Sequence, residues 1–119
     1  MRKSLTKAII ATALFATSGL GIYAATYSYG TNITSNGKTL TAYTAASNDN
    51  CSVTTHAYYI LSSTGKLADN NFFASRDPNT GQANIIKNAS TYNARYFTQA
   101  VSTHKVGNNT YKSSDVYNQ

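Results

Sequence analysis

The sequence predicts an all-β protein, either a small antiparallel β-sandwich or a twisted meander sheet, of about seven strands after an N-terminal signal peptide. Three observations predict this fold class. Trp and Glu are absent and Pro occurs once, whereas Asn, Thr, Ser and Tyr are abundant, a composition typical of strands joined by polar turns. Turn motifs recur at short intervals along the chain. Residues 52–62 alternate between an apolar and a more polar face, as a half-buried strand does.

The first 24 residues are predicted to be a signal peptide, followed by a single secreted β domain at residues 25–119. Three basic side chains occur near the start, and residues 8–17 (A-I-I-A-T-A-L-F-A-T) form an apolar core of signal-peptide length. Cleavage after Ala24 fits best, and cleavage after Gly21 is the alternative. A retained N-terminal anchor is the competing interpretation, but the apolar run is shorter than the roughly 20 residues that span a bilayer.

The first half of the domain is predicted to be three strands in series, which suggests an antiparallel meander. The segment 27–33 is followed by Asn-Gly at positions 36–37, a pair that strongly favours a hairpin because both residues accept positive φ. The return strand is 39–46, and a polar turn at 48–50 leads into 52–62.

Residues 52–62 are predicted to be the central strand. Its odd positions make the apolar face, and its even positions, which include His56 and Tyr58, make the more polar one. A related run, V-S-T-H at 101–104, resembles V-T-T-H at 53–56, and the two histidines of the chain end these two runs. The flanking residues do not align, so chance explains the similarity better than an internal duplication.

The second half is predicted to hold three further strands and one irregular segment. Segment 67–75 is interpreted as a loop with a short strand near Phe72, because the polar triplet D-N-N interrupts its apolar residues. Strands are expected at 83–88, at about 93–106 with a bend or bulge midway, and at 110–117 as an edge strand.

Cysteine catalysis has a single candidate nucleophile, Cys51. Cys51 and His56 are five positions apart, which places their side chains on opposite faces of a regular strand. His104 could reach Cys51 across strands, but no Asn or Asp is placed to orient its ring. A partly buried thiol is therefore expected, with a disulfide between two chains as the alternative.

Metal and acid–base chemistry lack a complete set of residues. His56 and His104 on adjacent strands could share a zinc or copper ion, but the Cys and His ligands of a structural zinc site are missing. Residues 77–81 (D-P-N-T-G) lack the third acidic position and the terminal Glu of a calcium loop, so a hairpin turn explains them. Without Glu, and with all four Asp expected in turns or near termini, paired catalytic carboxylates are not expected. We therefore expect no cofactor, no metal and no enzymatic activity.

The charge of the domain argues against a nucleic-acid partner. Three of the ten basic residues lie in the predicted signal peptide, which leaves seven against four Asp, an excess of +3 rather than the +6 of the whole chain. These seven are spread along the sequence instead of clustered. The C-terminal residues form no apolar tail, so a C-terminal anchor is not expected. We expect an extracellular protein without a transmembrane anchor, released or held non-covalently at the cell surface.

The expected function is the binding of a partner, namely a cell-envelope component or an extracellular protein or glycan. Tyrosine rings stack on sugars or on partner side chains, while amide and hydroxyl groups adapt their hydrogen bonds. The candidate binding surface is the face bearing His56 and Tyr58, or the face bearing Tyr96 and His104. The alternative is a toxin-like antimicrobial that acts on competitor cell envelopes, because the chain is similar to non-modified bacteriocins in its small size, mild positive charge and Tyr- and Thr-rich strands.

Overall fold

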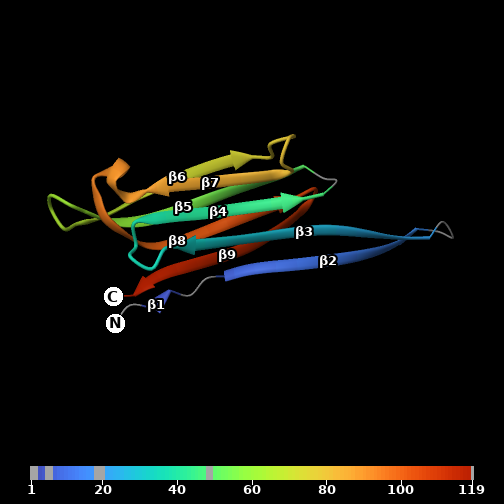
Figure 1. Cartoon of the computed structure of the whole chain (residues 1–119), viewed down its shortest axis with the longest axis horizontal. Coiled ribbons are helices and arrows are strands. Elements are labelled where there is room, and N and C mark those ends of the chain that lie inside the picture. Colours follow the sequence, from blue (N-terminus) through green and yellow to red (C-terminus); the bar gives the residue numbers. More distant parts are fainter. Residues whose placement is uncertain (1–2, 5–6, 18–20, 48–49, 119) are drawn as a thin grey trace.

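The computed structural model describes residues 3–4, 7–17, 21–47 and 50–118, and confirms an all-β fold of two antiparallel sheets (Figure 1). The first, called here the β5 sheet, has the strand order β1 (Lys3–Ser4), β9 (Asn109–Asn118), β8 (Ala94–Val106), β5 (Cys51–Leu61), β6 (Leu67–Ser75). The second, the β4 sheet, has the order β2 (Lys7–Thr17), β3 (Gly21–Ile33), β4 (Thr39–Ala46), β7 (Gln82–Asn88). The sheets pack against each other through β3 on β9 and β4 on β8, so the sandwich alternative is the one observed.

Strands β1 and β2 and the start of β3 fall within the predicted signal peptide. β2 pairs antiparallel with β3 from Lys7–Thr31 to Thr17–Gly21. Cleavage after Ala24 is a processing event that this arrangement does not test, so the boundary stays a prediction. Cleavage there would leave β3 and β9 as the outer strands of their sheets.

The meander expected for the first three strands is wrong. β3 and β4 form the predicted hairpin, but β5 belongs to the other sheet. Each of these strands buries one face only, and the chain changes sheet after Ala46 so that the apolar faces of β4 and β5 meet inside the sandwich.

The expectation of a loop with a short strand at residues 67–75 is also wrong, because β6 runs through the whole segment. It pairs with β5 from Ser52–Ser75 to Ile60–Leu67. The polar triplet D-N-N does not interrupt the strand because β6 lies at the edge of the β5 sheet and two of the three side chains, Asp69 and Asn71, point to the outward face.

The predicted central strand β5 pairs with the predicted long strand β8, which carries two bulges. The pairing passes from Tyr58–Gln99 to Tyr59–Phe97 and from Ile60–Tyr96 to Leu61–Ala94, so Thr98 and Arg95 are each left without a direct partner in this ladder. The expected mid-strand irregularity is therefore confirmed. Each bulge reverses the side of the sheet to which the following residues point.

The interior holds an apolar cluster and a polar cluster. Large members of the apolar cluster are Phe97, Ile33, Leu40, Tyr59, Phe72 and Ile85. The buried polar residues are Thr31, Thr44, Thr55, Ser102, His104, Ser113 and Asp115. Tyrosine contributes to the core as the composition suggests, since Tyr29 and Tyr59 are buried.

Candidate functional site

The predicted pair His56 and Tyr58 lies on the outward face of the β5 sheet. Both side chains are half-buried, and their rings stack with centroids 4.5 Å apart. Asp69 of β6 accepts a hydrogen bond from His56, with Nε2 and Oδ2 2.7 Å apart. A pair this exposed adds little to stability. Its structural effect is to hold the imidazole in one orientation beside the Tyr58 ring.

Two large apolar side chains flank this pair on β6. Leu67 is 63% exposed and Phe73 is 67% exposed. Phe73 pairs with Thr54 and Leu67 pairs with Ile60, and paired residues of an antiparallel ladder point to the same side. Leu67, Phe73, Asp69, His56 and Tyr58 therefore share one outward face, called here the β5–β6 surface.

The sequence does not reveal the three β6 residues of this surface, because the polar triplet D-N-N makes residues 67–75 resemble a loop. A period of two is present there. Ala68, Phe72 and Ala74 lie on the inner side, and Leu67, Asp69 and Phe73 lie on the outer side. The alternation of inner and outer side chains continues through the polar triplet, and it is the sequence signal for this strand and for its exposed apolar residues.

Tyr96 and His104, the second predicted pair, do not form a surface. Tyr96 is half-buried at the end of the sandwich, where its ring lies 5.0 Å from the ring of Tyr117 and its Cβ lies against Gly37 of the β3–β4 turn. His104 is 0% exposed and lies between the sheets. The expectation that His104 contacts a ligand is therefore wrong. His104 pairs with Val53 on the inner side of the sheet, and the bulge at Thr98 places Tyr96 on the opposite side.

His104 belongs to a hydrogen-bonded seam that joins both sheets. Thr44 of β4 donates to the carbonyl of Ser52 at 2.9 Å, so the imidazole must donate its Nδ1 proton to the Thr44 hydroxyl, 2.7 Å away. Ser113 of β9 lies 2.6 Å from Nε2 and donates to it when the ring is neutral. Burial lowers the pKa of His104 to about 4, so the neutral ring is the form at physiological pH.

The seam continues through hydroxyl groups of three more strands. Thr31 donates to Ser102 at 2.7 Å and lies 2.6 Å from Ser113, and Thr55 lies 2.8 Å from Ser102. Deeper along β9, the Asp115 carboxylate accepts the backbone N–H of Ile33 at 2.7 Å. These polar groups hydrogen-bond to one another, so the seam has a structural role in holding the strand register and the packing of the two sheets.

Cys51 is buried, and its thiol hydrogen-bonds to backbone carbonyls rather than to His104. Its thiol donates weakly to the carbonyls of Thr44 at 3.4 Å and Gly81 at 3.8 Å. Burial raises the pKa of the Cys51 thiol, partly offset by backbone hydrogen bonds and by the charge of Arg76. Cys51 faces inward and His56 faces outward, so the spacing argument that separated them is confirmed.

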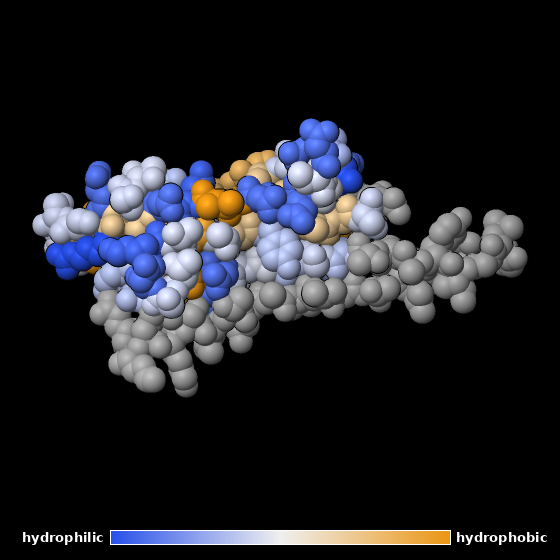
Figure 2. Space-filling view, in the orientation of Figure 1, coloured by the Kyte–Doolittle hydropathy of each residue, from blue (hydrophilic) through white to orange (hydrophobic). Residues whose placement is uncertain are grey.

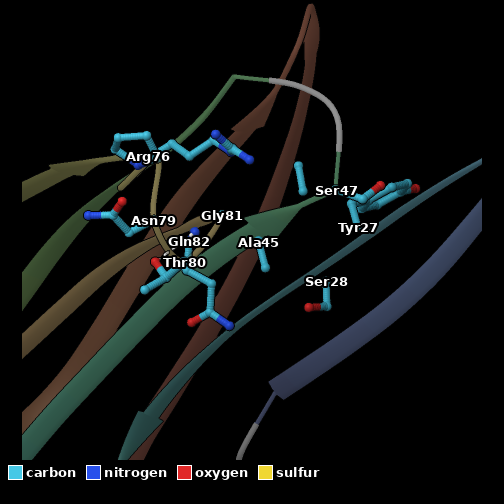
Figure 3. A pocket seen from close by; sticks show the side chains of 11 residues that line it. Tyr27, Ser28, Ala45, Ser47, Arg76, Asn79, Thr80, Gly81 and Gln82 are labelled. Carbon is cyan, nitrogen blue, oxygen red and sulfur yellow. Dashed lines mark hydrogen bonds between the residues drawn. The ribbon is translucent and has the colours of Figure 1, made fainter.

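A second candidate lies at the end of the β4 sheet, where the turn at residues 76–81 folds beside β3 and β4. It is a pocket of about 400 Å³. Figure 3 shows Arg76, Asn79 and Thr80 on one side and Tyr27 and Ser47 on the other. Hydroxyl and amide groups thus line a hollow whose single basic lining residue, among those the structure describes, is Arg76.

Arg76 brings positive charge to this pocket. Within residues 3–4, 7–17, 21–47 and 50–118, no hydrogen-bond partner is present for its buried Nε, and no carboxylate lines the pocket. Gly81 lies beside the guanidinium, and a Cβ at that position would be at an ordinary contact distance of 3.4 Å from Nη2 of Arg76. The predicted turn at 77–81 forms one side of this pocket, but the pocket itself is not predictable from the sequence, because its residues come from three separate segments.

Metal ligation has no complete site in the described part of the chain, where no three His, Cys, Asp or Glu side chains gather. His56 and His104 point to opposite sides of the β5 sheet, so they cannot share an ion. Across the same described residues, no helix has the length and apolar character needed to cross a membrane. Comparisons of the chain with protein-family models, curated proteins and solved structures found no significant match.

Proposed function

We propose that this chain is a small secreted, non-enzymatic β protein that binds a partner at the cell envelope or in the extracellular space through the β5–β6 surface. The observation that carries the proposal is the exposure of Leu67 and Phe73 beside the stacked His56–Tyr58 pair. An outward sheet face in contact with water alone normally carries polar side chains, and a grouped apolar and aromatic surface marks a contact site.

Two further features support this surface. The rings of His56 and Tyr58 are already held in place by stacking and by Asp69, so binding orders few side chains. β6 is also an edge strand, which leaves its outer side accessible to a large partner. The chemistry of the surface, two aromatic rings with a carboxylate and a leucine, suits a protein or a glycan.

Binding of the purified protein to intact cells, to cell-wall fractions and to secreted proteins tests this proposal. Tyr58→Ala and Phe73→Ala are expected to weaken binding at least about tenfold, the effect of removing a central aromatic contact. Thr110→Ala, at an exposed position of β9 outside both the β5–β6 surface and the hollows of the opposite sheet, is the control and should retain binding. Binding that survives both β5–β6 changes would refute the proposal.

The second candidate is the antimicrobial function. The same exposed Leu67 and Phe73, together with the excess of +3 predicted for the domain, favour contact with an anionic cell envelope. Growth of related bacteria in the presence of the purified protein is the test. Inhibition that is lost in Phe73→Ser would support this role, and the absence of inhibition by the unchanged protein would exclude it.

A further inference from the structure

Two hollows on the β4 sheet adjoin each other. The first is the Arg76 pocket, and the second is a hollow of about 450 Å³ on the outward face of β3, β4 and β7. Ser28 and Gln82 line both. The two hollows therefore form one elongated groove, called here the β4 groove, with Arg76 near one end and Tyr43, Asn84 and Ile86 near the other.

The Tyr43 end of the groove offers an aromatic ring beside amides. Tyr43 pairs with Gly30 on one side and with Asn84 on the other. Gly30 has no side chain, so one flank of the ring is not covered by a directly paired neighbour. Ile86 is 67% exposed next to it, and Figure 2 shows a small apolar patch among polar side chains over β4 and β7. No charged residue is among the described lining of this hollow.

The groove crosses the face of a sheet, and this position limits what can bind. The backbone groups of β4 are used in ladders with β3 and β7, so a ligand on the face meets side chains and cannot extend the sheet as a peptide strand does. The side chains it meets are a tyrosine ring, amides and hydroxyls, which complement the apolar faces and hydroxyls of sugar rings. At the other end, the guanidinium of Arg76, whose buried Nε has no hydrogen-bond partner among the described residues, favours a carboxylate or phosphate group.

We propose that the β4 groove binds an acidic oligosaccharide. A sugar ring lies against Tyr43, the amides of Gln82 and Asn84 hydrogen-bond its hydroxyls, and Arg76 binds the carboxylate or phosphate of a neighbouring unit. This site lies on the opposite sheet from the β5–β6 surface and does not depend on the function proposed for that surface. A chain with both sites could join an acidic glycan to a second partner.

Calorimetric titration of the purified protein tests the proposal with four probes. Trigalacturonate carries carboxylates, a phosphorylated mannose oligosaccharide carries phosphates, maltotriose is a neutral saccharide and an oligoglutamate is an acidic peptide. We expect one of the two acidic oligosaccharides to bind at least about tenfold more tightly than maltotriose, the effect of one charge-assisted contact. The anionic probe that binds shows whether the acidic group of the ligand is a carboxylate or a phosphate.

Variants then assign the contacts. Arg76→Gln is expected to remove the preference for the acidic probe over maltotriose. Tyr43→Ala is expected to weaken the binding of the acidic probe and of maltotriose to a similar extent. Arg95→Gln, an exposed arginine whose guanidinium binds the carbonyl of Ser62, is the matched charge control and should bind normally. Tyr58→Ala is the matched tyrosine control, and a loss confined to it would implicate only the β5–β6 surface.

Three results would overturn the proposal. The first is no binding of either anionic probe by the unchanged protein. The second is equal or tighter binding of the oligoglutamate. The third is unchanged acidic-probe binding by Arg76→Gln. Unfolding curves of each variant show whether it is folded, and if Tyr43→Ala is not, Tyr43→Leu, which keeps the apolar volume but removes the ring, takes its place.

Discussion

His104 lies directly opposite Val53 in the β5–β8 ladder, on the inner side of the sheet. The related runs 53–56 and 101–104 pair with each other in opposite directions, so the valine of one run faces the histidine of the other. The same pattern therefore presents one histidine to solvent and hides the other. This pairing explains why His56 is accessible to a binding partner, whereas His104 is buried and hydrogen-bonds between the two sheets.

The buried seam predicts a large difference between the two histidines. His104→Ala is expected to lower the free energy of unfolding by about 3 kcal/mol, because it creates a cavity and removes one hydrogen-bond partner from each of the hydroxyls of Thr44 and Ser113. His56→Ala, on the exposed face, should change it by less than about 1 kcal/mol. Urea unfolding followed by circular dichroism measures both, and equal effects would contradict the assignment of His104 to the seam.

The same residue predicts a dependence of stability on pH. His104 has an ordinary pKa of 6.5 when unfolded and about 4 when folded. Between these values the unfolded chain holds more protons, so the free energy of unfolding falls as the pH is lowered from 6.5 to 4, by about 3 kcal/mol in all. A titration of the His104 ring by NMR, with a midpoint near 4, is the direct check. A midpoint at or above 6.5 would show that the ring is not held in the buried, neutral state.

Cys51 is expected to be unreactive in the folded protein. Its side chain is buried and burial raises the pKa of the thiol, so little thiolate reaches solvent. N-ethylmaleimide should label the native protein far more slowly than the protein in denaturant, as measured by mass spectrometry. A disulfide-linked dimer on non-reducing gels of freshly purified native protein would show instead that Cys51 reaches the surface.

Two turn glycines predict a matched pair of stability changes. Gly37 and Gly65 both have positive φ, +75° and +69°. A Cβ at Gly37 would lie 2.7 Å from Cβ of Tyr96, whereas at Gly65 the nearest contact is the mobile end of Arg95 at 3.7 Å. Gly65→Ala should cost about 1 kcal/mol of backbone strain, and Gly37→Ala about 3 kcal/mol because a clash is added. Thermal unfolding of both variants tests the difference, which vanishes if Tyr96 does not pack on this turn.

The outward site could be predicted in part. Alternation along residues 52–62 placed His56 and Tyr58 together on the more polar face, and the structure keeps them there. The contributions of Leu67, Asp69 and Phe73 were not predicted, because an edge strand tolerates polar residues on its outer side and so resembles a loop. The Arg76 pocket was not predictable, since it depends on three segments meeting at one end of the sheet.

The sequence by itself determined the all-β class, the positions of most strands and the inward face of β5, because turn residues and a period of two are local properties of the chain. The tertiary structure decided which sheet each strand joins, where β8 bulges and therefore that Tyr96 and His104 lie on opposite sides of the sheet. The physical reason is that one extra residue in a strand reverses every later side chain. That reversal is set by the pairing partner, β5, which the sequence of β8 does not contain.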